Sequence, residues 1–410
     1  MRSQLNNWLR MLGAVALAVA SHACCATAQT STGTPPSSPQ VAQAATLAPG
    51  SQGAFQWQFP HDQRGVDDVT MVQAAIAAQG NHVFVPLAGG AGRNGVACLE
   101  ADVQTQTSPP AAWVYKTSHP VVNTPAVLGE MLLLVDGRAG DKSRHLQCVR
   151  IADQKPAWQV AIEENASGQF GAQAGAIVIQ SEHDAIRCLD EEGRLIWQRR
   201  IGRLTRPPAL GESRICLVHS APAEDGRARP ETDGEHCTLL RRDNGDTLAS
   251  HPAPDKVVAG PVMLAGRMWV GTGRGLRAFE LERGERVSKH PAAERPVRSD
   301  FAASDNRLAF LDDRQNVCAI DVRAEGDVAV LTGGHGNLAP CIVGNSLVWS
   351  GEDAIWLADL AAPGSPPRVW ADLSWLGAPA TSPVWHRGRL YLGVPRWGLV
   401  SFGVAGPAPK

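Results

Sequence analysis

The chain repeats one short pattern eight times, and this repetition restricts its fold more than any other feature of the sequence. The segment Pro125–Gly137 reads PAVLGEMLLLVDG, and the segment Pro261–Gly273 reads PVMLAGRMWVGTG. Both have a proline, an apolar run, a pair of turn residues with glycine, and a second apolar run. Self-similarity at a period of about 20 to 50 residues is typical of architectures that use one supersecondary unit repeatedly. We therefore expect a repeat fold.

The second apolar run of each copy is four residues long. These runs are His82–Val85, Leu132–Val135, Ala176–Ile179, Ile215–Val218, Met268–Gly271, Leu308–Leu311, Leu347–Ser350 and Leu390–Gly393. Another apolar phrase follows each run within a few residues, as in VACLEA, AIRCLD and VCAIDV. Short apolar runs separated by Gly, Asp and Asn are typical of strands rather than helices, and short turns between them favour antiparallel pairing.

The spacing of the copies indicates which repeat architecture forms. Residues 51–410 number 360 (410 − 50), which gives 45 residues for each of eight copies. This is the size of a four-stranded antiparallel blade, and small sheets that are apolar on both faces bury those faces by stacking on each other. The sequence therefore predicts an all-β fold, an eight-bladed β-propeller over residues 51–410.

A closed ring requires that the first and last blades pair, because unpaired sheet edges leave backbone groups without partners. The eighth copy runs out of chain at Lys410, before an outer strand could follow. The segment Ala54–Pro60 reads AFQWQFP, precedes the first copy, and alternates aromatic and other residues as a strand does. We predict that it is the outer strand of the eighth blade.

The N-terminus is predicted to be an export signal over residues 1–28. Arginines 2 and 10 precede or flank the apolar run Met11–Ala20, and Ala26–Ala28 offers a small-residue cleavage site. The run is about half as long as a membrane-spanning helix requires, so no transmembrane helix is expected in the mature chain. Residues 29–50 are rich in Pro, Ser and Thr and are expected to form a flexible linker.

A lipid anchor at Cys24 or Cys25 is the alternative for this end of the chain. The residues before Cys24 are Ser21, His22 and Ala23, without the large aliphatic residue that such a signal places three positions upstream. Simple cleavage after Ala28 is therefore preferred, and the mature protein is expected to be periplasmic or associated with the cell envelope.

Charge and cysteine content narrow the possible functions. The net charge is −2 and no basic block occurs, so no nucleic-acid partner is expected. Seven cysteines follow residue 28, an odd number that leaves at least one unpaired. Three of them, Cys98, Cys148 and Cys188, fall at equivalent places in successive copies, where stacked sheets about 10 Å apart prevent a disulfide between blades. A disulfide between Cys216 and Cys237, in adjacent predicted strands, is left open.

The repeat also resembles a known family. The segment Cys188–Trp197, CLDEEGRLIW, is similar to the signature of the PQQ-like propeller repeat, whose Trp docks between blades. Trp57, Trp113, Trp158 and Trp370 resemble the same position in other copies, whereas copies four to six lack the Trp. The segment Val297–Asp321 resembles a blade of the BamB type of this family, an outer-membrane protein assembly factor. The segment PDKVVAGP before the fifth copy does not match the acidic partner-binding loop of that type.

The family also includes PQQ-dependent dehydrogenases, so a small quinoprotein oxidoreductase is the alternative function. The resemblance implies a vicinal disulfide, a calcium ion and a catalytic Asp for such an enzyme. The only vicinal cysteines here precede residue 29, and the largest insertion, Ser220–Cys237, has no aromatic platform for a quinone. We therefore expect no catalytic, cofactor-binding or metal-binding residues, and neither PQQ nor calcium as a cofactor.

Two further motifs favour structural roles. His335 in GGHGN has no second ligand nearby, which is typical of a turn residue rather than a zinc ligand. The segment Gly271–Gly275, GTGRG, joins two predicted strands and opens no helix, so it indicates a hairpin turn rather than a phosphate-binding loop. The expected protein is a non-catalytic, monomeric propeller that binds a protein or cell-envelope partner through a face and residues that the sequence does not identify.

Overall fold

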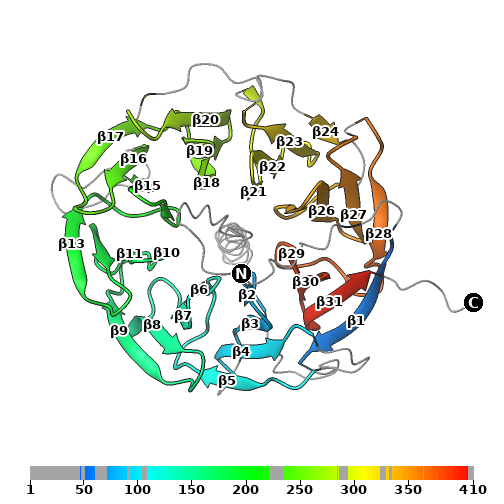
Figure 1. The fold of residues 1–410 in the computed structure, drawn as a ribbon, viewed down its shortest axis with the longest axis horizontal. Helices are drawn as coiled ribbons and strands as arrows, with labels where there is room; N and C mark the ends of the chain where they lie inside the picture. The colour runs from blue at the N-terminus through cyan, green and yellow to red at the C-terminus, as the bar shows by residue number, and fades with distance from the viewer. Residues whose placement is uncertain are drawn as a thin grey trace, which may run out of the picture.

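Eight antiparallel sheets stand in a ring around a central axis in the computed structural model, as Figure 1 shows. The structure describes residues 47, 51–60, 72–89, 93–102, 109–220, 234–283, 285, 294–323, 329–331, 335–362 and 364–404. These residues form no α-helix. The prediction of an eight-bladed β-propeller is confirmed.

Each of the first four blades has four strands, numbered from the axis outward. Blade 1 contains β2 (Ala77–Gln79), β3 (His82–Leu87), β4 (Gly95–Glu100) and β5 (Trp113–Lys116). Blade 2 contains β6 (Ala126–Leu128), β7 (Met131–Val135), β8 (Arg144–Arg150) and β9 (Pro156–Ile162). Blade 3 contains β10 (Phe170–Gln173), β11 (Ala176–Gln180), β12 (Ala185–Leu189) and β13 (Leu195–Arg200). Blade 4 contains β14 (Ala209–Leu210), β15 (Arg214–Ser220), β16 (Glu235–Arg241) and β17 (Thr247–Pro252).

The remaining blades complete the ring. Blade 5 contains, among the described residues, β18 (Val257–Leu264), β19 (Arg267–Thr272) and β20 (Gly275–Glu280). Blade 6 contains β21 (Ala302–Ser304), β22 (Arg307–Leu311), β23 (Val317–Asp321) and β24 (Ala329–Leu331). Blade 7 contains β25 (Cys341–Val343), β26 (Ser346–Ser350), β27 (Ala354–Asp359) and β28 (Arg368–Asp372). Blade 8 contains β29 (Val384–His386), β30 (Arg389–Val394), β31 (Gly398–Val404) and β1 (Gly53–Phe59).

The repeats map onto the blades as the sequence predicts. Every second apolar run lies in the second strand of its blade, and every following phrase overlaps the third strand. These central strands are buried because both faces of each blade pack on neighbours. For example, Phe84 of blade 1 packs with Leu132 and Leu134 of blade 2, and all three side chains are fully buried. The hydrophobic core is therefore a ring of interfaces between blades rather than one central cluster.

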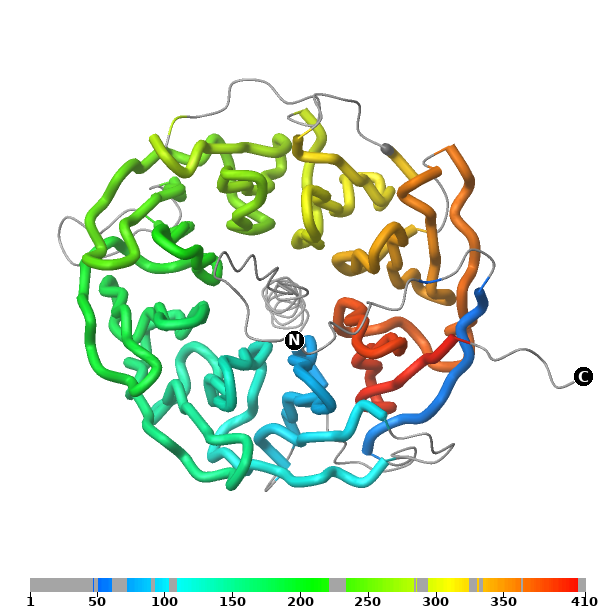
Figure 2. Tube along the Cα trace, viewed as in Figure 1, coloured from blue at the N-terminus to red at the C-terminus, as the bar shows by residue number. Residues whose placement is uncertain are grey.

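The ring closes through the N-terminal strand. Strand β1 pairs antiparallel with β31, from Gly53 opposite Val404 to Phe59 opposite Leu399. In Figure 2 the blue segment at the start of the described chain runs beside the red segment near its end. Trp57 of β1 is buried with Val83 and Leu99 of blade 1, so the closing strand also contacts the first blade. The prediction for Ala54–Pro60 is confirmed.

Several predicted segments lie outside the described residues. They are the export signal and nearly all of the linker, Cys24 and Cys25 among them, most of the Ser220–Cys237 insertion, and residues 286–293, where a fourth strand of blade 5 is expected. Within the described part of the chain, no helix is long and apolar enough to span a bilayer.

Candidate functional site

Tryptophans on the outer strands join three pairs of successive blades. Trp113, Trp158 and Trp197 lie on β5, β9 and β13, each directly opposite a cysteine of the neighbouring strand. Those cysteines are Cys98, Cys148 and Cys188, in the same order. The structure thus confirms that the three cysteines are equivalent and that the three tryptophans share one position.

Two of these indoles bind the next blade in the same way. The Nε1 of Trp158 donates to the Glu191 carbonyl of blade 3 at 2.8 Å, and the Nε1 of Trp197 donates to the Arg242 carbonyl of blade 4 at 2.8 Å. Each ring lies against a turn glycine with positive φ, Gly193 or Gly245, where an added Cβ would approach the indole to 2.6 or 2.7 Å. Only glycine fits such a turn beneath an indole.

The structure confirms the position expected for Trp57 and corrects the position expected for Trp370. Trp57 lies opposite Ser401 of β31, in the register where Trp197 lies opposite Cys188. Trp370 is displaced two residues along β28 from that position, which Arg368 occupies. Irregular pairing in β28 accompanies this displacement. Both indoles are fully buried, and Trp370 lies against Gly53 of the next blade, so they still bridge successive blades.

The seven described cysteines are buried, and none of them is in a disulfide. Burial raises the pKa of Cys98 to about 12 and the pKa values of Cys148 and Cys188 to about 11. These thiols are therefore protonated and unreactive at neutral pH. Cys216 faces Leu239 and Cys237 faces Val218, so these two cysteines are diagonal neighbours on one face of blade 4 and form no disulfide.

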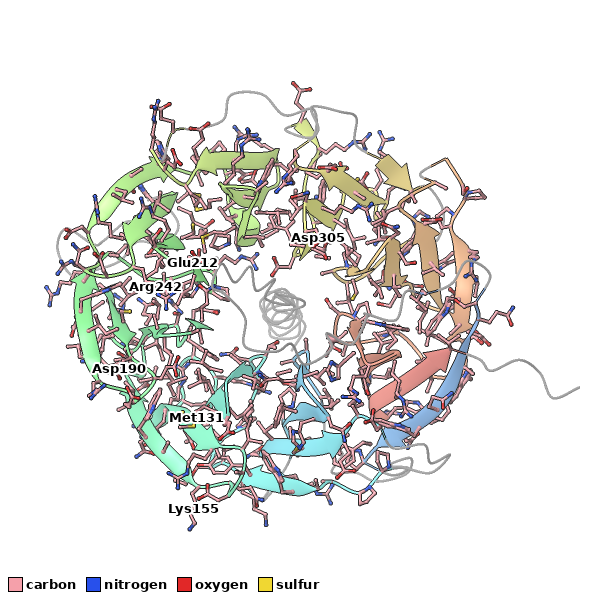
Figure 3. All side chains as sticks on the ribbon, in the orientation of Figure 1. Met131, Lys155, Asp190, Glu212, Arg242 and Asp305 are labelled. Atoms are coloured by element: carbon pink, nitrogen blue, oxygen red, sulfur yellow. The ribbon has the colours of Figure 1, made fainter. Side chains whose placement is uncertain are left out.

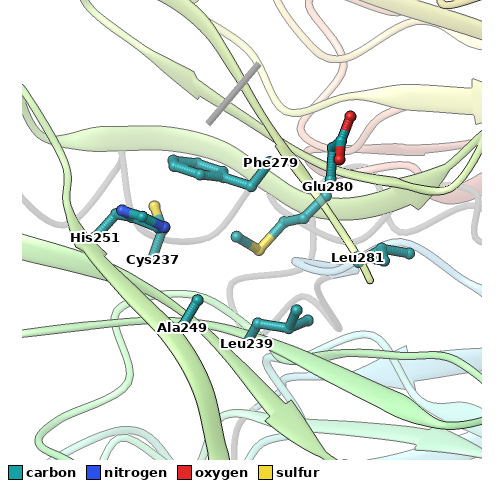
Figure 4. A pocket seen from close by; sticks show the side chains of 8 residues that line it. Cys237, Leu239, Ala249, His251, Phe279, Glu280 and Leu281 are labelled. Carbon is teal, nitrogen blue, oxygen red and sulfur yellow. The ribbon is translucent and has the colours of Figure 1, made fainter. Parts of the chain in front are cut away.

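The junction between blades 4 and 5 lacks the indole. Ala249 of β17 lies opposite Leu239, in the register where Trp197 lies opposite Cys188. A narrow pocket, too small to admit a water molecule, lies where an indole would dock. Figure 4 shows its lining, which consists of Cys237, Leu239, Ala249, His251, Met268, Phe279, Glu280 and Leu281.

A larger hollow of about 360 Å³ lies between blades 3 and 4, and we call it the arginine hollow. Its lining residues are Gly175, Ala176, Ile196, Glu212, Ser213, Arg214, Arg241, Arg242 and Asp243. Apart from Ile196, they come from the β10–β11 turn, the β14–β15 turn, the β16–β17 turn and the strand ends beside these turns. Those turns all lie at one end of their blades, because alternate turns of an antiparallel sheet share an end. Figure 3 labels Glu212 and Arg242 at this junction.

Backbone contacts hold two of the three guanidinium groups in the arginine hollow. Arg242 donates to the Gly211 carbonyl at 2.9 Å and to the Ala174 carbonyl, and Arg214 donates to the Leu281 carbonyl at 3.2 Å. In the described part of the chain, Arg214, Arg241 and Arg242 form no ion pair. Glu212 and Asp243 line the same hollow, so its lining has a net formal charge of +1 (3 − 2), which favours a carboxylate of a binding partner.

Exposed apolar side chains adjoin this hollow. Leu195 and Ile196 of β13 are 56% and 45% exposed, although they directly precede the buried Trp197. Strand β13 is also the outer edge of blade 3, so its free edge can accept an extended segment. The sequence pattern does not identify this surface, because its three arginines come from separate turns. The consecutive pair Leu195–Ile196 on an outer strand is the one signal that could have found the surface.

Residues 254–261, which do not match the acidic loop of the BamB type, are held in place by hydrogen bonds to other residues of this chain. The carboxylate of Asp300 accepts hydrogen bonds from the backbone amides of Gly260 at 2.9 Å and Phe301 at 3.0 Å. Desolvation raises the pKa of Asp300, while the charge of Arg206 opposes this rise. Arg206 itself donates to the carbonyls of Val257 and Val258. This arrangement orders the inner strand of blade 5.

The described residues contain no group of three or more His, Cys, Asp and Glu that could hold a metal ion. The segment Gly271–Gly275 forms the β19–β20 hairpin, with Thr272 paired to Gly275, which confirms a turn. No vicinal cysteines occur among the described residues, since Cys24 and Cys25 precede them. The expectations about PQQ and calcium stay predictions.

Comparison with known proteins agrees with the propeller repeat. The sequence model of the family described as "Outer membrane protein assembly factor BamB" matches residues 142–361, more than half of the chain. No curated protein matches the chain by sequence.

Solved structures show the same fold at low identity. BamB from Moraxella catarrhalis is 13% identical with a TM-score of 0.56, over 82% of this chain and 98% of that one. A quinohemoprotein alcohol dehydrogenase from Pseudomonas putida is 10% identical with a TM-score of 0.57, over 88% of this chain and 78% of that one. The computationally designed Ika8 protein is 11% identical with a TM-score of 0.65, over 85% and 99%. An outer membrane protein assembly factor and an alcohol dehydrogenase are therefore both among the proteins that share this fold.

Proposed function

Because the chain belongs to the family described as outer membrane protein assembly factor BamB, we propose that it is an exported, non-catalytic scaffold that binds a protein of the cell envelope. The observation that carries this proposal is the combination of the arginine hollow with the exposed apolar residues of β13. Apolar contact area beside unpaired guanidinium groups is typical of protein-binding surfaces. The partner is accordingly a protein that presents carboxylates beside apolar side chains.

The surface is preformed rather than assembled on binding. Arg242 spans the turns of blades 3 and 4 through the Gly211 and Ala174 carbonyls. Trp197 locks β13 to the same turn through the Arg242 carbonyl at 2.8 Å. A rigid surface loses little conformational freedom on binding, which favours affinity. Ile196 therefore stands at a fixed distance from the arginines.

Two substitutions and a matched control test this surface. We would tag the full chain, recover it from cells that make it naturally, and quantify the co-purifying envelope proteins by mass spectrometry. Ile196→Asp and Arg241→Glu should each remove one envelope protein that the unchanged chain retains. Val369→Asp, at a valine of blade 7 that is 47% exposed, should retain it. Equal recovery with all three variants would contradict a binding site at the arginine hollow.

The quinoprotein alternative has its own test. Its support is the fold similarity to the alcohol dehydrogenase, which at 10% identity concerns the fold alone. We expect the purified full chain to be colourless, to bind no added PQQ with calcium, and to reduce no dye in the presence of alcohols. Saturable PQQ binding together with alcohol-dependent dye reduction would replace the scaffold proposal by an oxidoreductase.

A further inference from the structure

The pocket between blades 4 and 5 brings together a thiol, an imidazole and a thioether. Cys237 and His251 lie directly opposite each other on β16 and β17, so they share the face of blade 4 that points to blade 5. Met268 lies opposite Phe279 on β19 and β20, and the Phe279 ring stacks on His251 at 5.1 Å between centroids. Cys237, Met268 and Phe279 also belong to one buried cluster.

Because β17 has Ala249 in place of the tryptophan, no indole of this strand covers Cys237, His251 and Met268. On β17, Ala249 and His251 are two residues apart and therefore point to the same side of the strand. Trp197 fills the corresponding place in blade 3, beside Cys188. With alanine at position 249, the side chains of Cys237, His251 and Met268 line the same pocket, as Figure 4 shows for Cys237 and His251.

The ligand types indicate which metal would suit the pocket. Zinc sites in proteins use about four N, S or O ligands, and the described residues provide no group of three or more His, Cys, Asp and Glu. Thiolate and thioether sulfur together select Cu(I), for which three soft ligands in a dry, apolar setting are sufficient. Apart from Cys237, His251 and Met268, the lining is apolar except for Glu280, and the pocket is too narrow for a free water molecule.

We propose that Cys237, His251 and Met268 form a binding site for a single Cu(I) ion. The Sγ of Cys237, the Sδ of Met268 and one imidazole nitrogen of His251 would be the three ligands. On binding, the S–H bond of Cys237 breaks, the sulfur donates an electron pair to copper, and the proton passes to solvent. Copper enters and stays as Cu(I), so no electron is transferred. This inference does not depend on the protein-binding surface of blades 3 and 4.

The thiol of Cys237 is otherwise inert. Burial raises its pKa to about 12, so it is protonated at neutral pH without a metal. Metal binding to a protonated thiol releases a proton, and affinity therefore rises with pH. Release of one proton per Cu(I) bound is a signature that simple packing of Cys and Met in a core would not give.

The test is an anaerobic titration with Cu(I) against a chromogenic Cu(I) chelator. The full chain would carry Cys24→Ser and Cys25→Ser throughout, because that vicinal pair would itself bind copper. We expect one Cu(I) per chain. Since changes outside the ligand shell alone cost about 10- to 100-fold in metal affinity, Met268→Leu should weaken binding at least about 10-fold and Cys237→Ser at least about 100-fold.

Controls separate ligation from folding. Met263→Leu and Cys216→Ala alter the same hydrophobic cluster outside the pocket, and they should bind Cu(I) as the parent does. Circular dichroism and thermal melts would establish that every variant is folded. Cu(I) should raise the melting temperature of the parent and not that of Cys237→Ser. The proposal would be overturned if the parent bound no Cu(I). It would also be overturned if Cys237→Ser and Met268→Leu bound Cu(I) as tightly as the parent does.

Discussion

Two neighbouring junctions of the ring are built from equivalent strands and differ in the residue at one outer-strand position. Between blades 3 and 4, Trp197 is 6% exposed and donates to the Arg242 carbonyl of the next blade. Between blades 4 and 5, Ala249 takes that place and a pocket remains. The repeat thus supplies an outer-strand position where an indole fills the space between two blades or, without the indole, a pocket remains. Stability and binding are therefore distributed unevenly around the ring.

Ring closure should show the largest effect on stability. Deleting residues 29–46 removes no described residue and should leave the melting temperature nearly unchanged, whereas Leu47 is buried in the core cluster of blades 7 and 8 and is kept. Deleting residues 29–60 removes β1 and the buried Trp57, whose truncation alone is expected to cost about 3 to 5 kcal/mol. Thermal melts of the two truncations measure the difference. Equal melting temperatures would mean that β1 does not close the ring.

The stability of the junction between blades 3 and 4 should depend on the indole of Trp197. Trp197→Ala removes a buried aromatic side chain and its hydrogen bond to blade 4, which should cost about 3 to 5 kcal/mol in urea unfolding. Trp375, which is 46% exposed, provides the control, and Trp375→Ala should cost much less. Similar losses in the free energy of unfolding for the two variants would show that docking of Trp197 on Gly245 stabilises the protein no more than the contacts of an exposed tryptophan do.

Blade 4 should also lose stability in acid where blade 3 does not. His219 is buried, and burial lowers its pKa to about 4, below the ordinary value of 6.5. The equivalent residue of blade 3 is Ser181, which does not titrate. The unfolded chain binds the proton first, so stability should fall as the pH drops from about 6.5 to 4, by roughly 3 kcal/mol in full.

Replacement of His219 tests that assignment. His219→Gln keeps a side chain that can bond to Thr238, the partner of the imidazole at 2.8 Å, and removes the titration. Urea unfolding at a series of pH values should show a flatter profile for the variant between pH 6.5 and 4. Unchanged slopes would place the acid sensitivity on another group.

The smallest effect is expected one residue before the docked indole. Ile196 is exposed, so Ile196→Asp should change the free energy of unfolding by less than about 0.5 kcal/mol. This result would distinguish Ile196, which is proposed to contact a partner, from Trp197, which docks on the next blade. A loss comparable to that of Trp197→Ala would mean that Ile196 stabilises blade 3 rather than contacting a partner.

The sequence is sufficient to predict the ring of blades, but it is insufficient to predict the binding surfaces of the ring. Apolar runs such as Leu132–Val135 recur at a fixed spacing, and the alternation at Phe55, Trp57 and Phe59 identifies the closing strand from local pattern alone. The predicted position of Trp370 is wrong because the irregular pairing near Trp356 leaves no signal in the sequence. A strand register depends on cross-strand packing, which local patterns do not encode.

The candidate sites require the three-dimensional arrangement. Arg214 and Arg242 are separated by 28 residues (242 − 214) and meet only because two turns of blade 4 lie at one end of the sheet. Cys237, His251 and Met268 fall on strands of two blades, and their common pocket depends on the register that opposes Ala249 to Leu239. Composition and spacing alone do not reveal either set.

Site-specific photo-cross-linking tests the central proposal most directly. A photoreactive amino acid would replace Ile196 in one full-length chain and Val369 in another, because the two side chains are 45% and 47% exposed on outer strands of different blades. Figure 1 places their strands, β13 and β28, on opposite sides of the ring. Irradiation of intact cells should yield one cell-envelope protein joined to position 196 and not to position 369. No adduct at position 196, or the same adducts at both positions, would contradict a protein-binding surface between blades 3 and 4.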